Sequence, residues 1–156
     1  VMKKYGYKSG IIFGLLLFAI GAFLFVPAAN THQYIFFLGA LFIIASGLTF
    51  LETAANPYAT ILGPQESSTQ RLNLAQSFNG LAAALAPLVG RFMILSDNPS
   101  SNEQIAAMSA EARYAYVQAE AGSVKLPFII LGSIILIVGI IFFFTKLYFQ
   151  VRLFRW

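Results

Sequence analysis

One acidic residue, Glu52, lies within a long apolar stretch and has polar neighbours at helical spacing. Intervals of three, four and four residues place four polar side chains on one helix face: Thr49, Glu52, Asn56 and Thr60. If the helix leaves the membrane at Leu62, Glu52 lies about 15 Å deep, near the bilayer middle. A carboxyl group in hydrocarbon favours its protonated form. The pattern predicts a site that exchanges a proton.

A second polar stripe follows on the next apolar stretch, where Asn73, Gln76 and Asn79 are three residues apart. Arg71 marks the entry to this stretch, which places Asn79 about 12 Å inside the membrane. Consecutive antiparallel helices would bring Asn79 and Glu52 to similar depths. Amides donate and accept hydrogen bonds, as sugar hydroxyls do, so the stripes predict a site for a polyhydroxylated neutral ligand. The candidate substrate-binding residues are Glu52, Asn56, Gln76 and Asn79, and Glu52 is also the candidate proton-coupling residue.

The composition favours lipid as the surrounding solvent. Of the 156 residues, 58% are hydrophobic and 10% are charged, and the mean hydropathy is +0.75. Soluble domains carry roughly 25% charged residues. The chain has no cysteine and one histidine, so we expect no metal site and no cofactor other than the proton as coupling ion. Without a second membrane carboxylate or a Ser–His pair we expect no enzyme, and the scattered basic residues do not form a nucleic-acid patch.

Four apolar runs are long enough to cross about 30 Å of hydrocarbon as helices. We expect transmembrane helices over 10–29, 33–62, 72–95 and 126–145, and thus an all-α membrane protein. The intervening segments are expected to be a cytoplasmic loop (1–9), a second cytoplasmic loop (63–71), an external loop with short helices (96–125) and a cytoplasmic tail (146–156). Within the external loop, Ser100 and Glu103 have capping-box spacing, and Ser109 precedes Glu111 as a second helix start.

The basic residues predict the orientation of these helices. Most of them fall on one side of the predicted spans: Lys3, Lys4, Lys8, Arg71, Lys146, Arg152 and Arg155. The opposite side has Arg113 and Lys125, and Arg91 lies at the rim of a span. The positive-inside rule therefore places both ends of the chain in the cytoplasm.

Three segments together form a recognisable pattern: Phe50–Tyr58 (FLETAANPY), Leu62–Pro64 (LGP) and Arg71–Asn79 (RLNLAQSFN). They resemble the fucose–galactose–glucose:proton symporter family of the major facilitator superfamily, and the resemblance extends from about Val1 to Leu147. That family has twelve helices in two halves around a midplane site. The resemblance implies that the chain is the third to sixth helices of the N-terminal half, a partial six-helix half-bundle.

The resemblance also implies roles for individual residues. Glu52 matches a fourth-helix glutamate implicated in proton coupling and sugar recognition, and Gln76 and Asn79 match fifth-helix residues that face the sugar cavity. The implied partners are a monosaccharide, a proton, the lipid bilayer and the remaining helices of the full-length transporter. The implied location is the bacterial cytoplasmic (inner) membrane.

We therefore expect a fragment of a proton-coupled sugar symporter of the hexose or fucose type, which imports a monosaccharide with a proton by alternating access. Two alternatives stay open. The chain could be a small four-helix proton-coupled carrier that acts as a dimer, with Glu52 of each copy near the symmetry axis. It could instead be a membrane scaffold subunit in which Glu52 only joins helices by a hydrogen bond.

Overall fold

A computed structural model describes residues 2–31, 33–94 and 101–145 of the chain, and these residues form helices joined by short connections. The elements are α1 (Met2–Thr31), α2 (Tyr34–Ile61), the 3₁₀ helix η1 (Gln65–Ser67), α3 (Ser68–Met93), α4 (Asn102–Ala107), α5 (Ala110–Ser123) and α6 (Lys125–Phe144). Four helical stretches are long and apolar enough to cross a membrane: Gly6–Thr31, Tyr34–Ile61, Gln65–Met93 and Ala110–Phe144. The predicted all-α membrane fold with four spanning helices is confirmed.

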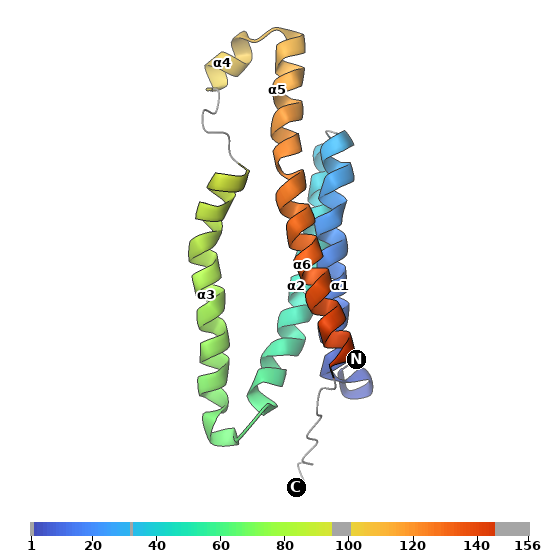
Figure 1. The fold of residues 1–156 in the computed structure, drawn as a ribbon, viewed down its shortest axis with the longest axis vertical. Coiled ribbons are helices and arrows are strands. Elements are labelled where there is room, and N and C mark those ends of the chain that lie inside the picture. The colour runs from blue at the N-terminus through green and yellow to red at the C-terminus, as the bar shows by residue number, and fades with distance from the viewer. Residues whose placement is uncertain (1, 32, 95–100, 146–156) are drawn as a thin grey trace.

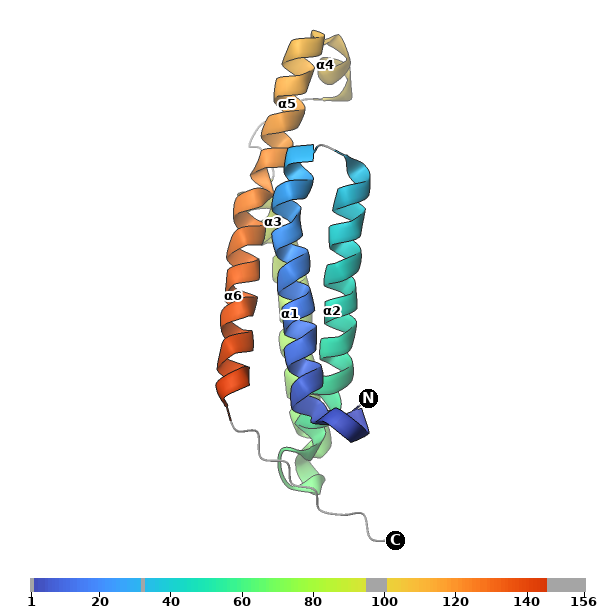
Figure 2. The ribbon, with the colours of Figure 1, turned by 90° about the vertical axis from the view of Figure 1, so that its right-hand side faces the viewer.

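Three of the long helices pack together and the fourth stands apart (Figure 1). Helix α1 lies between α2 and α6 and contacts both along its length (Figure 2). Helix α3 returns antiparallel to α2 and meets it mainly near the connecting turn (Figure 1). The buried core accordingly belongs to α1 and its neighbours, whereas α3 has no buried residue. We call α1, α2 and α6 the packed trio.

Glycines allow the backbones of α1 and α2 to approach closely. A Cβ atom added to Gly47 would lie 2.5 Å from the backbone nitrogen of Phe18, and one added to Gly14 would lie 2.8 Å from that of Leu51. Small residues at such contacts allow dense packing in membranes, where no hydrophobic force drives helices together. These contacts hold the middle of α2 against α1.

The start of the chain differs from the expected loop over 1–9. Helix α1 already begins at Met2, and its only break lies at Gly6, which has φ 75° and ψ 165°. Glycine adopts this conformation readily because it has no Cβ atom. The chain therefore enters the first span through a short helical segment that turns at Gly6.

The external segment contains two short helices, and the first begins one residue later than its expected cap. Ser101 accepts a hydrogen bond from the backbone of Gln104, and the Gln104 side chain accepts one from the backbone of Ser101, whereas Ser100 lies outside the described residues. A glutamine at the third helical position closes a capping box as a glutamate does. Ser109 caps α5, which continues into α6 as one long rod (Figure 1).

The other helix ends lie close to the expected bounds. Helix α3 begins at Ser68, four residues before the expected start at residue 72, so the last part of the expected loop 63–71 is helical. The 3₁₀ helix η1 directly precedes it. The expected tail, 146–156, lies outside the described residues.

Candidate functional site

Three amide side chains predicted to line a site are brought together by α2 and α3. The Nε2 atom of Gln76 donates a hydrogen bond to Oδ1 of Asn56 at 3.1 Å, which joins the two helices. The Nδ2 atom of Asn79 lies 3.5 Å from Oε1 of Gln76 and extends the chain of amides along α3. We call these three residues the amide cluster.

Glu52 lies on α2 one helical turn before Asn56. The interval of four residues places its carboxyl group on the same helix face as the amide cluster, about 6 Å away along the axis. Glu52 is exposed, and the structure gives it no hydrogen bond or ion pair among the described residues. Within this part of the chain Glu52 therefore does not join two helices, and its carboxyl group is free for a ligand or a proton.

The threonines predicted to share this face bind their own helix instead. The hydroxyl groups of Thr49 and Thr60 donate to the carbonyl oxygens of Ala45 and Pro57 at 2.9 and 2.7 Å. Such bonds satisfy a hydroxyl group inside hydrocarbon and bend the helix slightly. The polar face that remains for a ligand is narrower than the spacing predicts, and consists of Glu52 and Asn56.

Pro57 modifies the helix directly after Asn56. It lies inside α2 and has no N–H group, so the carbonyl of Thr53 lacks its usual helical donor. One turn later the hydroxyl of Thr60 donates to the carbonyl oxygen of Pro57 at 2.7 Å. In Figure 1 the C-terminal part of α2 turns towards α3. The bend brings Asn56 within reach of Gln76.

Chemically, the arrangement offers both kinds of hydrogen-bonding group next to one carboxyl group. Each amide carries two donors and an acceptor, and the contacts within the cluster leave part of this capacity unused. A carboxyl group inside a membrane binds and releases a proton when water or a ligand reaches it. No group of three His, Cys, Asp or Glu residues suited to a metal occurs among the described residues. The site is suited to a neutral polar ligand and a proton.

Two basic residues make contacts that the sequence reasoning missed. The Nζ atom of Lys8 donates to the carbonyl oxygens of Phe143 and Thr145, at the end of α6. Arg71 binds the end of α2 in a similar way. The signal that could have indicated these contacts is the set of unpaired carbonyl groups at every helix C-terminus, which cations satisfy.

No protein-family model matches the chain. Curated relatives do: an L-fucose-proton symporter of Escherichia coli (strain K12) is 48% identical over 147 residues, which are 94% of this chain and 34% of that protein. A glucose/galactose transporter of Brucella abortus biovar 1 (strain 9-941) is 43% identical over 146 residues, 94% of this chain and 32% of that protein. The chain thus spans about a third of the length of these relatives.

Solved structures agree with these relatives. A variant of the E. coli fucose:proton symporter, FucP, superposes with a TM-score of 0.85 at 47% identity, and a major facilitator superfamily transporter, FucP, in the outward conformation superposes with 0.84 at 48%. Each match covers 94% of this chain and 36% of the solved one. The chain is a multi-pass membrane protein of bacterial type, and it belongs to the major facilitator superfamily, in the group that includes the L-fucose-proton symporter and the glucose/galactose transporters.

Proposed function

We propose that the chain is the third to sixth helices of the N-terminal half of a proton-coupled sugar symporter, which imports a monosaccharide by alternating access. The observation that carries this proposal is the pairing of Asn56 with Gln76 across α2 and α3, one turn from the free carboxyl group of Glu52. The identity to an L-fucose-proton symporter and to a glucose/galactose transporter supports a hexose or fucose type of substrate.

In the proposed mechanism Glu52 takes a proton from the external side and helps to bind the sugar. Asn56, Gln76 and Asn79 donate to and accept from the sugar hydroxyl groups. As the two halves of the transporter rock, the sugar and the proton leave towards the cytoplasm. The mechanism needs no cofactor beyond the proton, and its chemistry is transport rather than catalysis, as it is in the relatives.

The proposed location is the bacterial inner membrane with both ends of this chain cytoplasmic. The start of α1, the turn between α2 and α3, and the end of α6 lie at one end of the molecule (Figure 1). Lys8 and Arg71 lie at that end, and the other basic residues of the flanking segments are Lys3, Lys4, Lys146, Arg152 and Arg155. This excess supports the orientation by the positive-inside rule.

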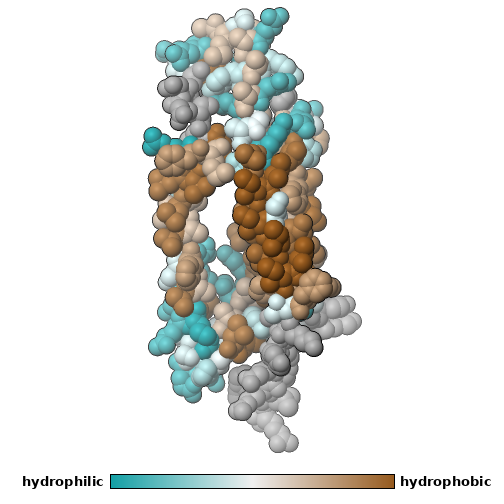
Figure 3. Space-filling view, in the orientation of Figure 1, coloured by the Kyte–Doolittle hydropathy of each residue, from teal (hydrophilic) through white to brown (hydrophobic). Residues whose placement is uncertain are grey.

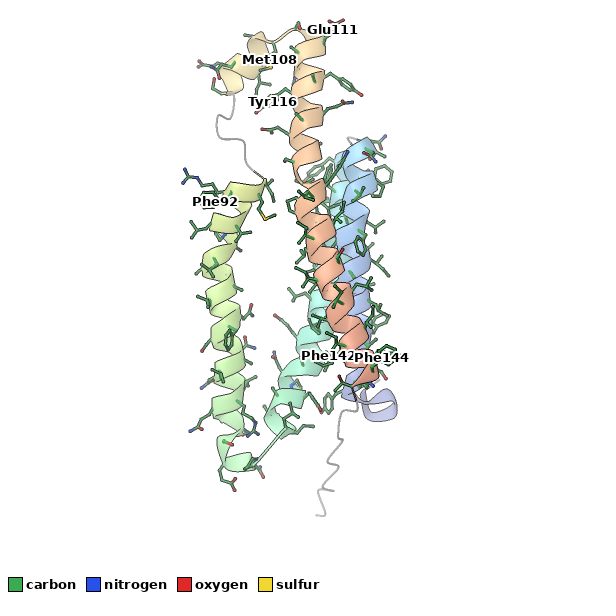
Figure 4. The ribbon with its side chains drawn as sticks, viewed as in Figure 1. Phe92, Met108, Glu111, Tyr116, Phe142 and Phe144 are labelled. Carbon is green, nitrogen blue, oxygen red and sulfur yellow. The ribbon has the colours of Figure 1, made fainter. Side chains whose placement is uncertain are left out.

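The remaining helices of the full-length transporter are the proposed partners of α3. Its apolar side chains are exposed, including Leu81, Leu85 and Leu88, and Phe92 at its C-terminal end is 83% exposed (Figure 4). An opening separates α3 from α6 in the space-filling view (Figure 3). Transmembrane helices pack against one another through such faces. The likeness to long sugar transporters does not favour the four-helix dimer or the scaffold subunit.

The test uses the complete transporter that contains this chain, in proteoliposomes with an imposed pH gradient. L-fucose, glucose and galactose are the candidate substrates, supplied one at a time. We expect Glu52→Gln to abolish gradient-driven accumulation, because the amide cannot exchange a proton. The control is Glu66→Gln, which neutralises an exposed glutamate on η1 and leaves uptake unchanged. Unchanged accumulation by Glu52→Gln would overturn the proton-coupling role.

A further inference from the structure

Arg71, in the first turn of α3, holds the end of α2. Its guanidinium group donates four hydrogen bonds, from Nε to the carbonyl oxygen of Ala59 at 3.1 Å, from Nη2 to that of Thr60 at 2.7 Å, and from Nη1 to that of Pro64 at 3.0 Å and to Oγ of Ser67 at 2.7 Å. The contacts span the last turn of α2, the connecting turn and η1. We call this arrangement the arginine clamp.

The clamp satisfies groups that a helix leaves unpaired. The last four carbonyl groups of an α-helix have no internal donor, and the helix end carries a partial negative charge that favours a cation. Ala59 and Thr60 belong to that last turn of α2. Each acceptor is a neutral oxygen, so the charge of Arg71 is used here on helix ends and turn carbonyls rather than on a carboxylate.

The fork of the guanidinium group is essential to this geometry. Its rigid plane presents five donors, whereas a lysine ammonium is a point charge on a flexible stem. The group also packs on the connecting turn, because a Cβ atom added to Gly63 would lie 3.0 Å from Nη1 of Arg71. A lysine at this position keeps the charge but cannot reach acceptors on both sides of the turn together.

The clamp lies close to the amide cluster. Gln76 follows Arg71 by five residues, about 7.5 Å along α3, and Asn56 precedes Ala59 by three, about 4.5 Å along α2. Helix α3 has no buried residue, so apolar packing within the chain does little to place it. The described polar contacts that join α2 and its turn to α3 are those of Arg71 and the Gln76–Asn56 bond.

We propose that Arg71 is a positioning residue: the arginine clamp sets the distance and angle between α2 and α3 at which Asn56 and Gln76 meet. Its effect on sugar binding rests on the proposed function, whereas its effect on helix geometry does not. The two effects are therefore measured separately, in the complete transporter reconstituted in nanodiscs.

The first measurement is a distance between α2 and α3. This chain has no cysteine, so cysteines introduced at Leu48 and Leu85, both exposed, carry a spin-label pair. Cysteines elsewhere in the transporter are replaced first. We expect Arg71→Lys and Arg71→Ala to broaden the distance distribution by double electron–electron resonance. The matched control is Arg113→Lys, an exposed arginine on α5, which leaves it unchanged. An unchanged distribution in both Arg71 variants would overturn the clamp.

The second measurement is sugar affinity by calorimetry in a double-mutant cycle. We expect Arg71→Lys to weaken binding about tenfold, equivalent to about 1.4 kcal/mol. In a Gln76→Ala background the amide pair is already absent, so Arg71→Lys should weaken sugar affinity less than about twofold. The effects of the two substitutions are then not additive, as expected for coupled residues. A merely structural arginine would give equal losses in both backgrounds, and that result would overturn the positioning role.

Two further outcomes keep the inference distinct from the proposed function. Ser67→Ala removes one acceptor of the clamp and should broaden the distance distribution less than Arg71→Lys, which tests the clamp if the arginine variants fail to fold. No broadening by Ser67→Ala in that case would overturn the clamp. If the unchanged transporter binds none of the three sugars, the proposed function fails, and the distance measurement still decides whether Arg71 sets the geometry of the two helices.

Discussion

The packed trio and α3 are built from similarly long apolar helices, yet they are held in different ways. In the trio, backbones meet at glycines and the buried core follows α1, with Ile11, Leu15 and Ala19 each at most 4% exposed. Helix α3 has no buried residue and is tied to α2 by hydrogen bonds at one end. The trio is thus a packed unit, and α3 is an apolar helix attached to it by polar contacts near one end.

The difference is consistent with the place of the proposed site. In the trio each polar side chain inside the membrane would need a partner, and Ser46, Thr49 and Thr53 find theirs in their own helix. Glu52 and Asn56 lie on one face of α2, and Asn56 meets Gln76 of the loosely packed helix α3. A site that must open to water and a sugar belongs at such a boundary, because densely packed helix contacts do not move continuously.

The largest expected effect comes from a substitution that disrupts the contact between α1 and α2 in the packed trio. Replacing Gly47 by leucine would drive a side chain into the backbone of Phe18, where an added Cβ atom already lies at 2.5 Å. Overpacking of this kind costs about 3 kcal/mol or more when the obstacle is backbone. We expect the 156-residue chain in detergent to lose its cooperative thermal unfolding transition, measured by circular dichroism.

The matched control lies on α3. Gly80 has no atom within 4 Å of an added Cβ, so Gly80→Leu should leave the transition of the same chain unchanged. If both leucine variants unfold alike, the contrast between the packed trio and α3 is wrong.

The sequence predicts the spans better than their pairing, for physical reasons. Long apolar runs predict membrane helices directly, because a chain segment in lipid must form its backbone hydrogen bonds internally and a helix does so. The partner of a small residue depends on which helices meet, so the spacing of glycines within one helix does not identify the backbone of Phe18 as the neighbour of Gly47. The polar residues of α2 and α3 were predicted to lie at similar depths below the same membrane face, and therefore close together. The structure pairs Asn56 of α2 with Gln76 of α3.

Arg71 could not be predicted from periodicity, because its acceptors are carbonyl groups that every sequence carries. The register of a short cap is equally uncertain, as the shift of the capping box to Ser101 shows. The roles of Glu52 and Asn79 in binding stay predictions, since they depend on a ligand.

A smaller effect would sharpen the role of α3. Asn79→Ala removes the outermost amide of the cluster, whose contact with Gln76 is long at 3.5 Å, so the fold loses little. We expect sugar binding by the complete transporter to weaken about tenfold, the value of one or two hydrogen bonds to a ligand. Calorimetry measures the affinity and circular dichroism checks the fold. The control is Ser77→Ala, because Ser77 donates to its own helix at the carbonyl of Asn73; equal affinity of Asn79→Ala and the unchanged protein would rule out the binding role.

The smallest expected effect concerns Lys8, which joins α1 to the end of α6 at the same end of the molecule as Arg71. The Nζ atom of Lys8 donates to the carbonyl oxygens of Phe143 and Thr145 at 2.7 and 2.9 Å, and its charge meets the negative end of α6. Lys8→Met keeps the apolar stem and should destabilise the end of α6 by about 1 kcal/mol. Hydrogen exchange should accelerate at the amides of the last turn of α6, while those in the middle of α1 keep their protection. Because the trio is packed along its whole length, we expect the loss of the Lys8 hydrogen bonds to affect only the end of α6. Loss of the arginine clamp should instead affect the position of α3 along its length. If Lys8→Met loosened α6 throughout, the trio would depend on end contacts as α3 does, and the distinction between the two regions would fail.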